Sequence, residues 1–136
     1  MSTIDEMVAS WRDTALVLAR VLVAALFLVS AYQSFENLGG AAAFFAWLGF
    51  PMPGVVAPAV MVFEFVAGIL LVAGFQTRIV VVLFGGFTLM AAITGHTDFA
   101  SANQLNHFLK NLAIVGGCAA LFVSGAGAYS VDFMRE

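Results

Sequence analysis

Four apolar stretches, each close to the length that crosses a lipid bilayer, constrain what this chain can fold into. They lie at residues 15–32, 55–75, 79–94 and 108–124. A membrane-spanning helix needs about 17 to 25 predominantly apolar residues, because the hydrocarbon core is roughly 30 Å thick. The last two stretches are at the short end of that range. The chain is therefore predicted to be an all-α, polytopic transmembrane four-helix bundle, with residues 1–136 forming a single transmembrane domain.

The composition excludes the ordinary classes of soluble protein. Hydrophobic residues make up 62 % of the chain and charged residues only 10 %, whereas soluble domains carry about a quarter charged residues. The net charge of -3 leaves no basic patch for nucleic acid. The lipid bilayer is the partner that this composition predicts.

The segment between the first two spans contains a short aromatic run at about residues 40–48, which is too short to cross a membrane. It ends at Gly49, Pro51 and Pro53, so we expect a short interfacial helix there. An aromatic anchor in the headgroup region and a lid over a site are both compatible with it. Before the first span, residues 1–13 read as an interfacial or loosely ordered head, with Asp13 as a helix N-cap.

The few basic residues predict the orientation. If both termini share one side, that side holds Arg12, Arg78 and Arg135, with Arg20 near the start of the first span, and the opposite side holds only Lys110. The positive-inside rule then places both termini in the cytoplasm.

Glu64 is the most informative single residue, because it is the only charge in the second apolar stretch. An acid at membrane depth is costly and is therefore expected to be functional or tied to a partner. Arg20 is the only charge within the first stretch, so we expect a buried Arg20–Glu64 ion pair. This pair could be a structural clasp alone, or a clasp that also lines a ligand site.

The helix faces that carry these two charges are made of small side chains, which permit close helix contact in lipid. They are Ala57, Ala67 and Gly68 on the Glu64 side, and Ala24 and Ala31 on the Arg20 side.

Further polar residues lie near the opposite side of the bundle. Lys110 and Asn111 stand early in the fourth helix, and His96 and His107 flank a polar loop. The two histidines lack the spacing of a helical metal pair, so no metal site is predicted. A neutral imidazole can donate a hydrogen bond to a quinone oxygen near the membrane surface.

An internal repeat is also visible. Residues 19–27 resemble residues 77–84, and each segment places an arginine, Arg20 or Arg78, at the start of a helix that runs outward. The alternating topology predicts a parallel repeat of two helical hairpins. The tight connection at residues 76–78 should make the second and third spans antiparallel neighbours.

The ordered pattern of motifs resembles the DoxX family of small four-helix membrane proteins. The resemblance covers nearly the whole chain from Arg20 onwards. It is carried by Ala19-Arg20-Val21, Gly49-Phe50-Pro51-Met52-Pro53, Phe63-Glu64-Phe65-Val66-Ala67-Gly68, Gly74-Phe75-Gln76-Thr77-Arg78, His96, Phe108-Leu109-Lys110-Asn111-Leu112 and the late Ser124-Gly125-Ala126-Gly127-Ala128-Tyr129-Ser130-Val131-Asp132.

The resemblance implies a bacterial inner-membrane protein linked to redox metabolism, since some relatives look like subunits of thiosulfate:quinone oxidoreductase. The charged residues that match family positions are Arg20, Glu64, Arg78 and Lys110, with Asn111 and His96 as polar companions. One departure is that many relatives carry a Gly-x-x-Lys-like pattern at the end of the first helix. This chain has residues 31–34, Ala-Tyr-Gln-Ser, at that place.

The leading hypothesis is a membrane subunit of a quinone-linked oxidoreductase system that binds a quinone or similar small redox molecule. Glu64 is the best candidate for a catalytic residue, and Arg20, His96, Lys110 and Asn111 complete the expected binding set. The chain has no built-in redox centre, so electrons would come from a redox partner protein, a bound cofactor or the substrate itself. The alternatives are a small proton-coupled transporter and a structural assembly subunit, and a homo-oligomer stays open.

Overall fold

The computed structural model describes residues 2–136, and every regular element in that part of the chain is a helix. The helices are α1 (Thr3–Glu36), α2 (Leu38–Trp47), α3 (Pro53–Ala73), α4 (Thr77–Gly95), α5 (Ala102–Ser124) and α6 (Val131–Met134). Four of them, α1, α3, α4 and α5, are long and apolar enough to cross a membrane. The predicted all-α fold with four spans and one short extra helix is confirmed.

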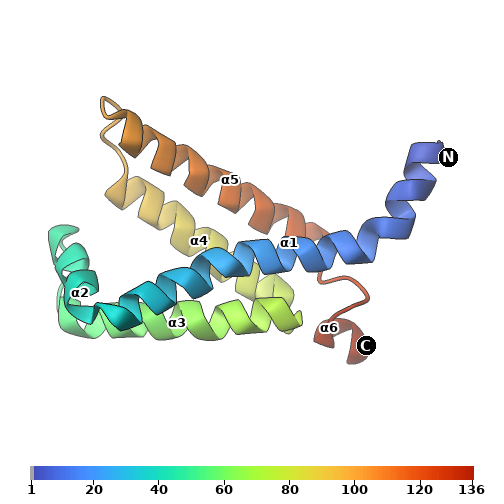
Figure 1. The fold of residues 1–136 in the computed structure, drawn as a ribbon, viewed down its shortest axis with the longest axis horizontal. Helices are drawn as coiled ribbons and strands as arrows, with labels where there is room; N and C mark the ends of the chain where they lie inside the picture. The colour runs from blue at the N-terminus through green and yellow to red at the C-terminus, as the bar shows by residue number, and fades with distance from the viewer. Residues whose placement is uncertain (1) are drawn as a thin grey trace.

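The four long helices form two pairs, α1 with α3 and α4 with α5, as Figure 1 shows. The short helix α2 and the α4–α5 loop lie at one end, which we call the α2 end. Both chain termini and the α3–α4 turn lie at the opposite end, the terminal end. Two hairpins are the arrangement that the internal repeat predicts. Helices α3 and α4 touch, but each packs mainly against the other member of its own pair.

Helix α1 is longer than expected and corrects the prediction for the head of the chain. It begins at Thr3, because Ser2 and Asp5 form a capping box in which each side chain accepts from the other residue's backbone N–H. Residues 3–13 are therefore helical, and the N-terminal part of α1 projects beyond the bundle (Figure 1). The expected N-cap role of Asp13 is wrong, since this residue lies well inside the helix.

The helix faces predicted to be small are the buried faces. Residues spaced three or four apart point inward, and they are Arg20, Ala24, Phe27 and Ala31 on α1 and Ala57, Glu64, Ala67, Gly68 and Leu71 on α3. Between the two pairs, the rings of Phe27 and Phe84 stack with centroids 3.7 Å apart. Both charged residues of interest are therefore inside the bundle.

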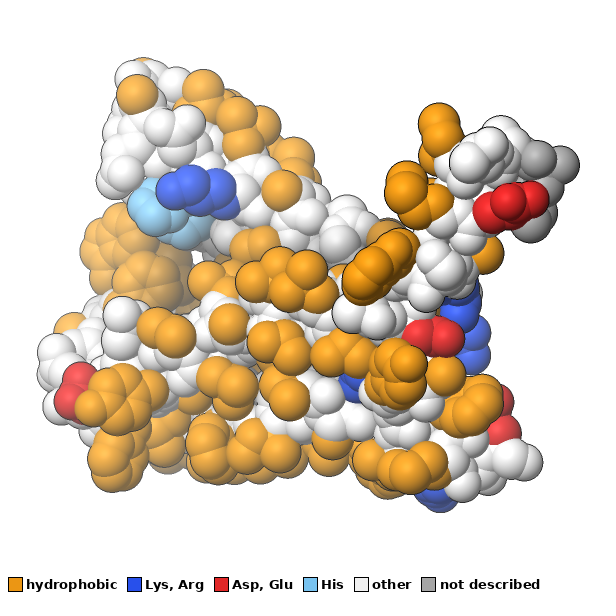
Figure 2. All heavy atoms as spheres, turned by 45° about the vertical axis from the view of Figure 1, so that its right-hand side comes forward, with side chains coloured by type: hydrophobic (Ala, Val, Ile, Leu, Met, Phe, Trp, Pro, Cys, Tyr) orange, Lys and Arg blue, Asp and Glu red, His pale blue; other side chains and the backbone are white. Residues whose placement is uncertain are grey.

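The outer surface is apolar on all four long helices, as the hydrophobic side chains in Figure 2 show on the visible face. Leu22 is 63 % exposed and Val123 is 80 % exposed. A continuous apolar surface of this extent marks contact with other molecules, and on helices of spanning length that contact is lipid.

Close approach of α1 and α3 yields a test of the packing. A side chain at Gly68 would meet Leu28 and lie near the backbone of Ala24, whereas one at Gly86 would meet nothing within 4 Å. We expect Gly68→Leu to lower the free energy of unfolding by about 1 to 3 kcal/mol through overpacking. The matched Gly86→Leu should not be destabilised. Thermal unfolding in detergent measures both, and equal losses would contradict the packing.

Candidate functional site

Glu64 lies within α3, buried at 5 % exposure, and the hydroxyl of Ser30 in α1 donates a hydrogen bond to its Oε1 at 3.1 Å. Its second carboxyl oxygen, Oε2, has no hydrogen-bond partner among residues 2–136. Ser30 was not predicted as a site residue. The available signal was the one serine in the first apolar stretch, whose role can be recognised only once the register of α1 and α3 is known.

Arg20 is buried at 1 % exposure and directs its guanidinium to backbone carbonyls instead of to an acid. Nη1 donates to the carbonyl of Val72 at 2.9 Å and, more weakly, to that of Leu71 at 3.4 Å. Nη2 donates to the carbonyl of Tyr129 at 2.6 Å. These contacts fix Arg20 at the C-terminal end of α3.

The predicted Arg20–Glu64 ion pair is therefore wrong. Within the described residues the single ion pair joins Arg12 and Asp13 at 3.3 Å. The physical reason is the register of the antiparallel helices α1 and α3. Ser30 stands opposite Glu64, and Arg20 is ten residues, about 15 Å, further along α1. A guanidinium already bonded near the end of α3 cannot also reach the middle of that helix.

The arginine contacts supply the hydrogen-bond donors that the C-terminal ends of helices lack. The last four carbonyls of a helix have no intrahelical donor, and they form the negative end of the helix dipole. Nε of Arg78 donates to the carbonyl of Phe122 at 2.9 Å, and Nη2 of Arg12 donates to that of Ser124 at 3.1 Å. Arginines thus cap the ends of α3 and α5.

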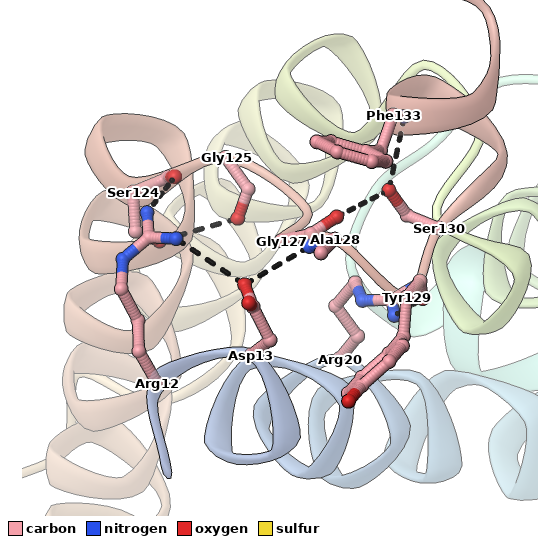
Figure 3. Close-up of polar contacts among 10 residues, drawn as sticks. All are labelled: Arg12, Asp13, Arg20, Ser124, Gly125, Gly127, Ala128, Tyr129, Ser130 and Phe133. Atoms are coloured by element: carbon pink, nitrogen blue, oxygen red, sulfur yellow. Dashed lines mark hydrogen bonds and ion pairs between the residues drawn. The ribbon is translucent and has the colours of Figure 1, made fainter. Parts of the chain in front are cut away.

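The C-terminal segment, residues 125–136, joins the two helix pairs at the terminal end (Figure 3). Oδ1 of Asp13 accepts from the backbone N–H of Ala128 at 2.9 Å. The carboxylate of Asp132 accepts from the N–H groups of Gln76 at 2.7 Å and Thr77 at 2.9 Å, which start α4. Burial alone would raise the pKa of Asp132, but these hydrogen bonds outweigh it and hold that pKa below its ordinary value. None of these contacts was predicted.

At the α2 end, the rings of His96 and His107 stack with centroids 5.0 Å apart, and His96 Nδ1 lies 3.0 Å from Oε1 of Gln104. Lys110 is exposed and Asn111 is partly buried.

The structure therefore separates the predicted site residues into three places. Arg20 lies at the terminal end, Glu64 lies beside Ser30 in the middle, and His96, Lys110 and Asn111 lie toward the α2 end. No hydrogen bond or ion pair links these groups within residues 2–136. In that same range, no three His, Cys, Asp or Glu residues gather in a way that could hold a metal ion.

Four membrane-length helices around a buried acid define a small polytopic membrane protein. The DoxX family model matches residues 15–97, and the chain belongs to the DoxX family. It is 34 % identical over 120 residues to inner membrane protein YqjF of Escherichia coli K12, covering 88 % of this chain and 91 % of that protein. It is 36 % identical over 127 residues to inner membrane protein YphA of the same strain, covering 89 % and 90 %. No solved structure gives a significant match.

The first prediction from this geometry concerns the cap on α3. Arg20→Lys should lower the free energy of unfolding by about 2 kcal/mol, because one ammonium cannot reproduce the fork of donors that serves α3 and Tyr129. Arg12→Lys, at an arginine that is 53 % exposed, should cost less than about 1 kcal/mol. Thermal unfolding in detergent compares the two variants. Equal losses of stability in the two variants would contradict a larger contribution from the buried arginine.

The second prediction concerns pH. Because folding lowers the pKa of Asp132, its contribution to stability is present above the unfolded pKa of about 4 and is lost as pH falls through the folded value. Asp132→Asn should therefore be less stable than wild type at pH 7, and this difference should shrink below about pH 4. Unfolding measured at pH 7 and at low pH tests this. Asp98→Asn, in the exposed α4–α5 loop, is the matched control for the loss of one carboxylate away from this contact.

Proposed function

We propose that this protein is a bacterial inner-membrane protein that binds a quinone or a similar small redox molecule, as the membrane subunit of an oxidoreductase system. The observation that carries the proposal is Glu64, an acid buried among membrane-spanning helices, with one carboxyl oxygen that has no partner in the described part of the chain. Intramembrane acids of this kind are costly and mark sites of function. The two relatives named inner membrane proteins support the location.

In this proposal, the ligand of Glu64 is a flat apolar molecule with a few polar atoms. Ser30 holds Oε1, which leaves Oε2 for a ligand. When protonated, Glu64 can donate a hydrogen bond to a quinone carbonyl. The neighbouring residue Phe63 packs edge-on against Phe84 and Phe87, with centroids 5.6 and 5.7 Å away. Apolar walls with one or two placed polar groups are typical of small-molecule sites.

The other residues of the expected binding set take more distant roles in this proposal. His96, Lys110 and Asn111 would line the approach from the α2 end, while Arg20 would support the site only by fixing the end of α3. Electrons would reach the quinone from a redox partner protein, and Glu64 would exchange a proton with the reduced ring. This proton exchange is its proposed catalytic role.

The positions of the basic residues support an orientation with both termini in the cytoplasm. Arg12, Arg20, Arg78 and Arg135 all belong to the terminal end, whereas Lys110 stands on the half of α5 that begins at the α2 end. The positive-inside rule then assigns the terminal end to the cytoplasm and the α2 end to the opposite side of the membrane.

The test is binding of a short-chain ubiquinone to purified protein in detergent. Glu64→Gln should raise the dissociation constant about tenfold, the effect of losing roughly 1.4 kcal/mol of hydrogen bonding, and Ser30→Ala should weaken binding less. Glu36→Gln, at the exposed end of α1, is the matched control. Unchanged binding by the Glu64 variant would contradict the proposal. Solute flux in proteoliposomes that requires Glu64 would favour transport instead.

A further inference from the structure

A cavity of about 660 Å³ opens at the terminal end, between α1, the α3–α4 turn and the C-terminal segment. A smaller apolar groove of about 210 Å³ adjoins it on the lipid-facing side of α4 and α5. Arg78 and Ile79 line both spaces. A polar chamber and an apolar groove therefore meet at one arginine.

Arg78 is an anchored cation in this cavity that has donors to spare, whereas the guanidinium of Arg135, which also lines it, lies over the ring of Phe75. Its Nε is bonded to the carbonyl of Phe122, so the side chain is anchored, but Nη1 and Nη2 have no hydrogen-bond partner among the described residues. Arg12 is engaged with Asp13 and Ser124. Two terminal nitrogens in the plane of one guanidinium match the spacing of two phosphate oxygens.

The charged side chains around the cavity, with Arg78 included, balance. The lining contains three arginines, Arg12, Arg78 and Arg135, and three acids, Asp13, Asp132 and Glu136. The cavity as a whole therefore does not select for a strongly anionic ligand. A group that carries a phosphate near Arg78 and a cationic or neutral head toward the acids suits this mixture.

The groove provides a place for an apolar chain attached to that group. Its walls beyond Arg78 are Ile79, Val82, Leu83 and Phe122, and each of the four is about half exposed. Ile79 is in the first turn of α4, so the groove runs from the terminal end of the bundle into the hydrocarbon region. Phosphate at the membrane surface with an acyl chain directed inward is the arrangement of a phospholipid.

We propose that this corner of the bundle binds one glycerophospholipid, with its phosphodiester on Arg78 and an acyl chain along Val82, Leu83 and Phe122. The site is separate from Glu64 and does not depend on the proposed quinone function. The bound lipid bridges α4 and α5 next to the cap that Arg78 places on α5.

Native mass spectrometry of the full-length protein in mild detergent tests the proposal, with titration of phosphatidylethanolamine as the probe. Arg78→Gln should raise the dissociation constant of the lipid about tenfold, because a charge-assisted phosphate contact is lost. Val82→Trp should also weaken binding by filling the groove without touching the charge. The matched controls are Lys110→Gln, which removes a charge elsewhere, and Val62→Trp, since Val62 is 54 % exposed and Val82 is 55 % exposed.

Ligands that lack one part of the lipid distinguish the contribution of the phosphate from that of the acyl chains. Diacylglycerol without a phosphate and inorganic phosphate without acyl chains should each fail to raise the melting temperature that the intact lipid raises. Stabilisation by inorganic phosphate that survives Val82→Trp would overturn the lipid assignment in favour of a free anion. Equal lipid affinity in wild type, Arg78→Gln and Val82→Trp would overturn the site altogether.

Discussion

The hydrogen-bonding needs of helix ends govern the terminal end of this protein. Where a span ends at the edge of lipid, its final carbonyls need donors, since an unsatisfied backbone group costs several kcal/mol there. The buried guanidinium of Arg20 serves α3 and the C-terminal segment at once. Its position leaves no room for a side chain at Gly74, where a Cβ would collide with Arg20 Nη1. The α3–α4 turn is built around this contact.

The same device appears once in each hairpin. Arg20 near the start of the membrane part of α1 bonds the carbonyl of Val72, close to the end of α3. Arg78 at the start of α4 bonds the carbonyl of Phe122, close to the end of α5. The two arginines that mark the internal repeat in the sequence therefore each cap the C-terminal end of the other helix in their hairpin. The C-terminal segment then ties the halves together through Asp13 and Asp132.

The sequence predicted the spans and the inward faces, because span length and three-to-four spacing act within a single helix. It did not predict the register between helices. Arg20 and Glu64 were each correctly placed on a buried face, yet a shift of a few turns along α1 separates them. The contacts of Asp132 could not be predicted from the sequence either. That residue lies in a segment without apolar periodicity, and it accepts hydrogen bonds from amides 55 and 56 residues earlier in the chain.

The separation of Arg20 from Glu64 changes how the buried acid should be understood. Had the two residues paired, the acid could have been explained as half of a structural clasp. Arg20 instead clasps α1 to α3 through backbone carbonyls, and that contact needs no acid. Burying Glu64 costs free energy, and within residues 2–136 the side-chain hydrogen bond that offsets this cost is the one from the hydroxyl of Ser30. A methionine or leucine would pack there without that cost. The clasp made by Arg20 thus does not account for Glu64, and this supports the proposed role of its Oε2, which has no partner among residues 2–136, in holding a ligand.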